Sequence, residues 1–181
     1  RIFTHFAEHF HELCSMRFGI IGLGNIGRRV ADIASCFGAD VVYYSTSGSP
    51  EQEGYHQVDF DTLLSTSDII SIHAPLNSNT EGLINAKALE KMKSSAILLN
   101  LGRGPIVVEQ DLADALKKGT IAAAGLDVLC QEPMSTDNPL FDIRDSKKLL
   151  ITPHVAWAAV ESRTRLMEII HGQIKEFFSA S

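Results

Sequence analysis

The sequence has few cysteines, no cluster of basic residues and no long apolar run, and each absence excludes a class of protein. Its three cysteines, Cys14, Cys36 and Cys130, lie far apart with no Cys-x-x-Cys pair. We therefore expect neither a disulfide framework nor a metal site, and a reducing cytoplasm fits this pattern. The formal net charge of −6, without any Lys/Arg-rich block, argues against nucleic acid as a partner. No run approaches the roughly 20 apolar residues of a membrane span, and the first residues do not resemble a signal peptide.

What the chain does contain is an alternation of short apolar runs and amphipathic stretches within 181 residues, of which 45% are hydrophobic. Helices are expected over 25–38 and 110–119, each ending on a glycine, and from about 157 to 178. Continuous apolar strands that alternate with helices predict a parallel sheet covered on both faces. The expected fold is α/β, a Rossmann-type doubly wound parallel sheet in three layers (α/β/α). Six runs are predicted to be its strands: FGII, VVYY, IISI, AILLN, AAAGLDV and LLIT.

A glycine pattern follows the first predicted strand and opens the first predicted helix. It is G-x-G-x-x-G, formed by Gly22, Gly24 and Gly27. In this context the first glycine permits a tight turn, the second lets a pyrophosphate approach, and the third lets the helix lie close to the strand. Free N–H groups at Asn25 and Ile26 would meet the phosphate charge. The pattern predicts a dinucleotide site, against the alternative of a turn that serves packing alone.

The residue expected to bind the adenosine ribose is Ser45, which stands 18 positions past Gly27 at the end of the second predicted strand. A carboxylate is usual there, because it holds the ribose hydroxyls and repels a 2′-phosphate. Serine can hold the ribose hydroxyls only in part and cannot repel a 2′-phosphate. However, no Arg or Lys stands nearby to bind that phosphate. NAD is therefore the expected cofactor, and NADP is not excluded.

Three polar residues follow other predicted strands: Arg103, Glu132 and His154. Because the carboxyl ends of parallel strands share one edge, we expect the three on one rim beside the cofactor. An imidazolium there can protonate a carbonyl oxygen while hydride reaches the carbon, a carboxylate can hold the ring, and a guanidinium can bind a substrate carboxylate. Gly102 and Gly104 flank the arginine, and we expect them to take positive φ and to let another molecule approach.

These stretches resemble the D-isomer-specific 2-hydroxyacid dehydrogenase family: GLGNIG, the HAPL turn, NLGRGPIVVEQDL, AGLDVLCQEP and ITPHVAWAAVESR. The similarity covers about residues 16–177, and the ITPHVAW ending is most similar to glycerate (hydroxypyruvate-reducing) members. The resemblance implies that Arg103 anchors the substrate carboxylate, that His154 is the acid/base and that Glu132 is its partner. Asp127 would face the nicotinamide carboxamide. The implied cofactor contacts are Asn25, Ile26, Ser45, His73, Ala74, Thr80, Leu101, Gly102 and Asp127.

The chain departs from the family pattern in its domain organisation. Members have a second domain that closes over the substrate, whereas here only residues 1–15, interpreted as an interdomain remnant, precede a cofactor domain over 16–181. An open cleft excludes water poorly, so we expect little or no turnover from this chain alone. The resemblance also implies a homodimer through this domain and a small 2-oxo or 2-hydroxy acid as substrate.

Three alternatives stay open at this stage. C-terminal-binding-protein corepressors resemble the same family, so the chain could be a non-catalytic dinucleotide sensor. His5 and His9 have the spacing of a helical metal site, although nothing completes it, and the tail of an interdomain helix is the other interpretation. Trp157, the only tryptophan, either roofs the site or caps the start of the last helix.

Overall fold

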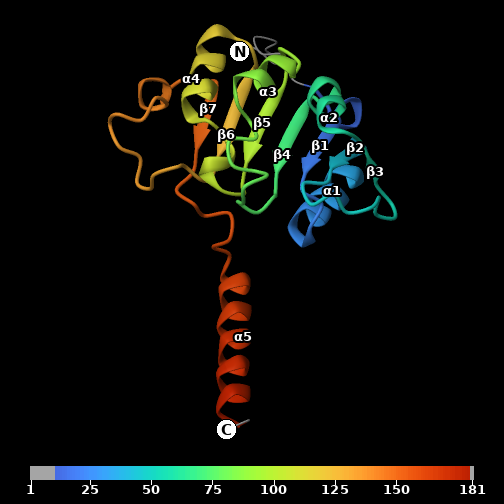
Figure 1. The fold of residues 1–181 in the computed structure, drawn as a ribbon, viewed down its shortest axis with the longest axis vertical. Coiled ribbons are helices and arrows are strands. Elements are labelled where there is room, and N and C mark those ends of the chain that lie inside the picture. The colour runs from blue at the N-terminus through green and yellow to red at the C-terminus, as the bar shows by residue number, and fades with distance from the viewer. Residues whose placement is uncertain (1–10, 180–181) are drawn as a thin grey trace, which may run out of the picture.

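The computed structural model describes residues 11–179, which form one seven-stranded sheet with helices on both faces (Figure 1). The strands lie in the order β3-β2-β1-β4-β5-β6-β7, and every neighbouring pair is parallel. The doubly wound parallel sheet expected from the sequence is therefore confirmed. The strands are β1 (Arg17–Ile21), β2 (Asp40–Tyr44), β3 (His56–Gln57), β4 (Ile69–Ile72), β5 (Ile97–Asn100), β6 (Ala123–Leu126) and β7 (Leu149–Ile151).

The helices build the two outer layers. Leu63, Leu89 and Leu112, from α2, α3 and α4, pack into one buried cluster on one face of the sheet, and Ala31 and Ala34 of α1 pack into a second cluster on the other. This arrangement confirms the three layers. The α-helices are α1 (Asn25–Cys36), α2 (Phe60–Thr66), α3 (Ala86–Lys91), α4 (Glu109–Lys118) and α5 (Val160–Ser179), with 3₁₀ turns η1 (Leu13–Ser15), η2 (Gly104–Ile106) and η3 (Phe141–Ile143).

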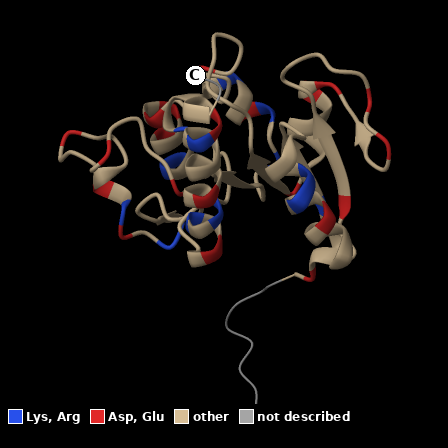
Figure 2. Cartoon of the chain, turned by 90° about the horizontal axis from the view of Figure 1, so that it is seen from below, with Lys and Arg blue, Asp and Glu red and all other residues tan. Residues whose placement is uncertain are grey.

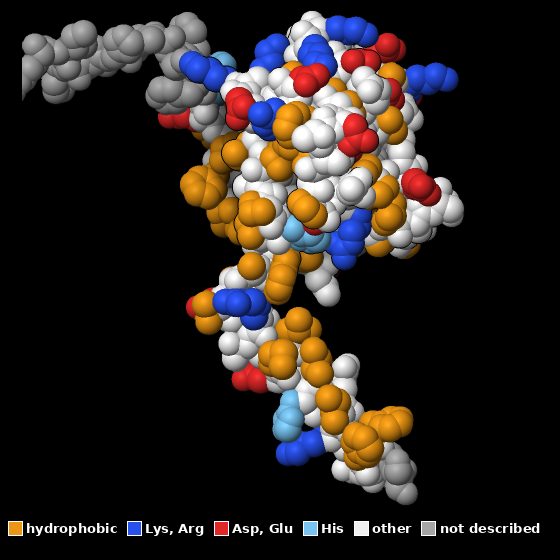
Figure 3. All heavy atoms as spheres, turned by 90° about the vertical axis from the view of Figure 1, so that its left-hand side faces the viewer, with side chains coloured by type: hydrophobic (Ala, Val, Ile, Leu, Met, Phe, Trp, Pro, Cys, Tyr) orange, Lys and Arg blue, Asp and Glu red, His pale blue; other side chains and the backbone are white. Residues whose placement is uncertain are grey.

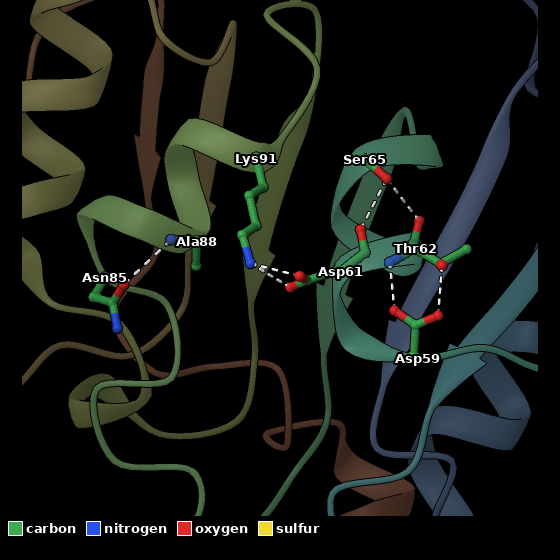
Figure 4. Close-up of polar contacts among 7 residues, drawn as sticks. All are labelled: Asp59, Asp61, Thr62, Ser65, Asn85, Ala88 and Lys91. Atoms are coloured by element: carbon green, nitrogen blue, oxygen red, sulfur yellow. Dashed lines mark hydrogen bonds and ion pairs between the residues drawn. The ribbon is translucent and has the colours of Figure 1, made fainter.

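Local chemistry fixes the ends of these helices. At the start of α2 the Asp59 carboxylate accepts hydrogen bonds from the backbone and hydroxyl of Thr62, and Asn85 caps α3 in the same way (Figure 4). Lys91 of α3 reaches Asp61 of α2 at 2.6 Å, which ties the two short helices together. Such caps satisfy backbone N–H groups that have no partner inside the helix.

The sequence predicted that a glycine ends each of the helices α1 and α4, and the structure confirms both positions. Gly38, two residues past the end of α1, has φ +85°, and Gly119 caps α4 with φ +75°. Both are in the left-handed region, which costs a glycine least because it has no Cβ.

Helix α5 extends away from the sheet, below it in Figure 1, and none of its residues is buried. It presents a row of hydrophobic side chains to solvent (Figure 3), among them Met167, Ile170, Ile174 and Phe177. Over residues 11–179 no helix combines the length and the apolar character that a membrane crossing needs.

The topology determines where a ligand can bind. Strand β1 lies between β2 and β4, so the chain proceeds outward from β1 in both directions. Ligands of doubly wound sheets bind at this switch point, outside the carboxyl ends of the strands. Those ends form the lower edge of the sheet in Figure 1 and face the viewer in Figure 2.

Candidate active site

The glycine turn after β1 has the shape that a dinucleotide requires. Gly22 has φ +91° and donates its N–H to the Tyr44 carbonyl, and a Cβ on it would lie 2.9 Å from the backbone of Ala74. A Cβ on Gly27 would fall 2.2 Å from the carbonyl oxygen of Gly22, whereas one on Gly24 would meet nothing within 4 Å. Gly22 and Gly27 are thus required by close packing, and Gly24 leaves open space in front of α1. The three predicted glycine roles agree with this geometry.

Open space continues to the first turn of α1. The helix begins at Asn25 with Gly24 as its N-cap, and neither a side-chain cap nor an acidic residue occupies its first turn. Within the described residues, the N–H groups of Asn25 and Ile26 have no hydrogen-bond acceptor. Exposed N–H groups together with the positive end of the helix dipole favour a phosphate at this position.

A cavity of about 580 Å³ lies beside this turn, at the carboxyl ends of β4, β5, β6 and β7. Six of the site residues predicted from the sequence are in its lining, and Arg103 and His154 are among them. Its lining consists of Ile26, Val30, His73, Leu101, Arg103, Asp127, His154, Ala156 and Trp157. Trp157 lies in this lining, three residues before α5 begins, which favours its interpretation as part of the site over a helix cap.

His154 and Glu132 form a hydrogen-bonded pair at this cavity. The Nδ1 atom of His154 lies 2.8 Å from a Glu132 oxygen, and the other oxygen accepts the Leu129 N–H at 2.9 Å. The bond from Leu129, followed by that from His154, holds the pKa of Glu132 below its ordinary value. An ionised carboxylate can only accept, so Nδ1 carries the proton and Nε2 is left for a ligand.

The backbone at His154 is held in an uncommon conformation. Its φ is +52°, the only positive value of a non-glycine residue in the described chain, and its N–H donates to the Thr152 carbonyl. Residues kept in this region often lie at functional sites, where the surrounding structure offsets the conformational cost.

Asp127 provides much of that surrounding structure. Its buried carboxylate accepts hydrogen bonds from the hydroxyl of Thr152 at 2.5 Å and from the N–H groups of Val155 and Ala156, both at 2.9 Å. Burial by itself raises the pKa of Asp127, but the bonds from Thr152, Ala156 and Val155 outweigh it and the net pKa is lowered. Asp127 therefore anchors the loop that carries His154. Its expected contact with a nicotinamide carboxamide stays a prediction.

Replacing Asp127 with asparagine is expected to lower the free energy of unfolding at pH 7 by about 1–3 kcal/mol, because hydrogen bonds to a buried carboxylate are lost. The folded-state pKa lies below the unfolded value of about 3.9, so this stabilisation is complete above that value and is lost as the pH falls through the folded pKa. Urea unfolding at pH 7 and at about pH 3 checks it. The difference in free energy of unfolding between the wild type and the variant should be smaller in acid. A difference that does not depend on pH would contradict the assignment. Asp142→Asn, the same change at an exposed position, is the control.

Arg103 reaches the same cavity from the loop after β5. One guanidinium nitrogen, Nη1, donates to the Gly102 carbonyl at 2.7 Å, and within the described residues no carboxylate pairs with this side chain. Asn100, fully buried at the end of β5, fixes the loop by accepting from the Gly102 N–H and donating to the Arg103 carbonyl. Asn100 was not predicted as a site residue, although a polar residue that ends an apolar run is the signal that could have found it.

The expectation that the glycines around Arg103 take positive φ was wrong, whereas the cofactor contact of Gly102 stays a prediction. Neither Gly102 nor Gly104 has positive φ. A Cβ on Gly104 would lie 2.0 Å from the carbonyl carbon of Leu129, and one on Gly102 would lie 3.0 Å from the Ala74 carbonyl oxygen. These glycines let neighbouring loops touch each other, and Gly104 in particular faces protein backbone.

The implied cofactor residues of the β4 loop divide into two groups. His73 lines the cavity, bonds Ser71 through Nε2, and has its pKa lowered by burial. Thr80 is fully buried, and its hydroxyl donates to the Pro75 carbonyl and accepts the Asn77 N–H. Thr80 thus stabilises the turn, and its contact with a cofactor remains a prediction without support from its position.

A metal centre is not supported by the described residues. They contain no group of three or more His, Cys, Asp or Glu side chains placed to hold an ion, and His5 and His9 lie outside the described range. Partial burial, followed by the charge of Glu109, raises the pKa of the Cys130 thiol to about 11, which disfavours the thiolate that would react or bind a metal.

Residues 3–156 match the family model described as D-isomer specific 2-hydroxyacid dehydrogenase, NAD binding domain. The chain belongs to this dehydrogenase family. It is 46% identical to a hydroxypyruvate reductase of Blautia hydrogenotrophica over 172 residues, which are 94% of this chain and 52% of that protein. The chain spans about half the length of the curated dehydrogenase relatives that it matches.

Solved structures of the dehydrogenase family agree with the fold. D-lactate dehydrogenase from Aquifex aeolicus, complexed with NAD and lactic acid, matches with a TM-score of 0.88 and 29% identity, over 97% of this chain and 58% of that one. A probable 2-hydroxyacid dehydrogenase from Rhizobium etli, in complex with NADP, matches with a TM-score of 0.78 and 26% identity, over 94% of this chain and 56% of that one. Both cofactors thus occur among the structural relatives, and nothing in these comparisons favours the corepressor alternative.

Proposed function

We propose that this NAD-binding domain carries the acid/base and anion-binding residues of an enzyme that interconverts 2-oxo acids and D-2-hydroxy acids. One observation carries the proposal: His154, whose Nδ1 is hydrogen-bonded to Glu132, and Arg103, whose guanidinium has no carboxylate partner within the described residues, line a single cavity beside the glycine turn. A dinucleotide on that turn would extend from α1 along the edge of the sheet towards this cavity.

The residues divide the chemistry among themselves. Arg103 binds the substrate carboxylate through its free N–H groups, because a guanidinium matches two carboxylate oxygens. His154 gives its Nε2 proton to the carbonyl oxygen during reduction and takes a proton from the hydroxyl during oxidation. Glu132, which stays ionised, holds the ring in the required tautomer and balances its positive charge. The nicotinamide, when bound, supplies or accepts the hydride at the neighbouring carbon.

We propose further that a substrate-side domain completes this site. The cavity is open towards the solvent, and α5 leaves the edge of the sheet next to it with its apolar side chains uncovered (Figure 3). Both features suit a second domain that closes over the substrate and excludes water. We expect the chain to bind NADH without reducing 2-oxo acids at an appreciable rate.

The experiment that tests the function is a graft. The chain replaces the matching 172-residue segment of the Blautia hydroxypyruvate reductase, and this protein is called the hybrid enzyme below. Oxidation of NADH is followed with hydroxypyruvate, glyoxylate, pyruvate and longer 2-oxo acids. We expect turnover with at least one of them, and Arg103→Gln should lower kcat/KM by roughly 10²-fold, mainly through KM. A well-folded hybrid that binds NADH but reduces none of them would favour the dinucleotide sensor.

We also propose a homodimer through this domain and a reducing compartment. Ile33 of α1, Phe37 just after that helix and Leu150 of β7 are 60–67% exposed and leave apolar surface uncovered on the α1 side of the sheet. Light scattering of the purified chain should give twice the monomer mass, and a monomer at micromolar concentration would contradict the dimer. The compartment is supported by the three cysteines, all of which are free thiols.

A further inference from the structure

A second cavity, of about 840 Å³, opens at the carboxyl end of β2, where the proposed function places the adenosine ribose. Its lining consists of Tyr44, Ser45, Thr46, Gly48, Glu51, Gln57, Val58, Asp59 and Asn79. Two carboxylates are in this lining, and no lysine or arginine is. The whole loop from β2 to α2 has the same charge, because it contains acidic residues and no lysine or arginine (Figure 2).

Of the two carboxylates in this lining, Glu51 is the one with an oxygen left to contact a ligand. One of its oxygens accepts the Gln57 N–H at 3.0 Å and approaches Nδ1 of His56 at 3.2 Å, and the other has no hydrogen bond within the described residues. The bond from Gln57, followed by that from His56, lowers the pKa of Glu51. Both oxygens of Asp59, in contrast, accept bonds from Thr62 at the start of α2. Glu51 thus presents a free, ionised oxygen at the cavity.

The loop that carries Glu51 is tied to the dinucleotide turn. The neighbouring Gln52 donates its side-chain amide to the Leu23 carbonyl at 3.0 Å, and its backbone N–H donates to the Tyr43 hydroxyl at 2.7 Å. That hydroxyl in turn donates to Gln57. These bonds connect the loop to β2 and to the turn before α1, so the position of Glu51 relative to a dinucleotide is fixed by the fold.

The nearest arginine does not offset this negative charge. The guanidinium of Arg28 bonds the side chain of Gln52 at 2.5 Å and the carbonyl of Glu53, and it lies over the ring of Tyr55. These contacts hold the guanidinium against the loop, and Arg28 is not in the lining of the second cavity. The hydroxyls of the serines that follow β2 are neutral and bond one another, so they supply no charge to hold a phosphate.

We propose that Glu51 sets the cofactor preference of this domain, selecting NAD and rejecting NADP in place of the acidic residue that Ser45 does not supply. This inference rests on the proposed function, because it assigns the second cavity to the adenosine ribose. A 2′-phosphate in the cavity would face an ionised carboxylate with no cation to bind it. The 2′-hydroxyl of NAD would instead find a hydrogen-bond acceptor in the free oxygen of Glu51.

The test is a titration of the purified chain with NADH and NADPH separately, following the fluorescence of Trp157, its only tryptophan. We expect the Kd for NADPH to exceed that for NADH by at least about tenfold. Glu51→Gln should tighten NADPH roughly 3- to 10-fold and should change NADH by less than about 3-fold, because it removes the charge and keeps an acceptor for Gln57. High salt should reduce the ratio of the NADPH Kd to the NADH Kd in the wild-type chain, because salt screens a repulsion between charges close to the surface.

Glu53→Gln is the matched control, since it removes the same charge from the same loop at a position outside the cavity lining. It should leave the ratio of the two Kd values unchanged. If Glu51 served only the structure of the loop, its replacement would weaken both cofactors equally. The assignment would be overturned by such an equal weakening of both cofactors, or by equal effects of Glu51→Gln and Glu53→Gln on the ratio of the two Kd values. It would also be overturned if the wild-type chain bound NADPH more tightly than NADH. Failure of NADH itself to bind would instead contradict the proposed function.

Discussion

Replacing His154 with asparagine in the hybrid enzyme is expected to lower kcat/KM for 2-oxo acid reduction by roughly 10²- to 10⁴-fold, the usual contribution of a positioned general acid. The cavity holds one other histidine, His73, whose pKa is lowered by burial and whose Nε2 is bonded to Ser71. It cannot take over the proton transfer from that arrangement. Steady-state rates with the best 2-oxo acid of the panel measure the effect.

Asparagine suits this test better than alanine. The backbone of His154 has φ +52°, which asparagine tolerates more readily than most residues, and the amide of asparagine can still donate to Glu132. The variant should therefore fold normally and bind NADH within about twofold of the wild-type chain. A rate loss of less than tenfold would contradict the assigned role, and a parallel loss of NADH affinity would indicate that His154 positions the cofactor instead.

The parts of the fold that could be predicted from the sequence are those that a single strand pattern decides. The six apolar runs are all strands, because a strand buried on both faces needs little more than continuous apolar residues. Strand β3 escaped notice since it spans only His56 and Gln57, whose pairing with Val42 and Tyr43 comes from backbone hydrogen bonds at the sheet edge. Nothing in the local composition of such a segment distinguishes it from the surrounding loop.

In the candidate site, too, some residues could be predicted from the strand pattern and others depend on contacts between distant segments. Arg103, Glu132 and His154 could be placed together from the topology, because parallel strands bring the loops at their carboxyl ends to one edge. The task of Asp127, as an anchor of the His154 loop, depends on three donors about 25–29 positions further along the chain, and no local pattern shows such contacts. The role of Gly104 was missed for a related reason, since its neighbour in space is the backbone of another loop.

That close contact leads to the second large effect. Replacing Gly104 with alanine is expected to lower the free energy of unfolding of the chain by about 2–4 kcal/mol, because the new Cβ would lie 2.0–2.4 Å from the backbone of Leu129 and Cys130. Backbone cannot rotate away as a side chain can, so the β5 and β6 loops must separate. Urea unfolding measures the loss, and stability within 1 kcal/mol of wild type would contradict the packing argument.

Gly24→Ala provides the matched contrast, because it adds the same methyl group where nothing lies within 4 Å. The φ of −82° and ψ of −165° at Gly24 are accessible to alanine, so stability should change by no more than about 1 kcal/mol. The methyl group would instead occupy the space where a diphosphate approaches α1, and the affinity for NADH should fall at least about tenfold. Gly104→Ala would thus act on folding and Gly24→Ala on the cofactor, although both glycines lie in loops on the same edge of the sheet. An unchanged NADH affinity in Gly24→Ala would place the diphosphate elsewhere and would remove the basis for locating the ribose next to Glu51.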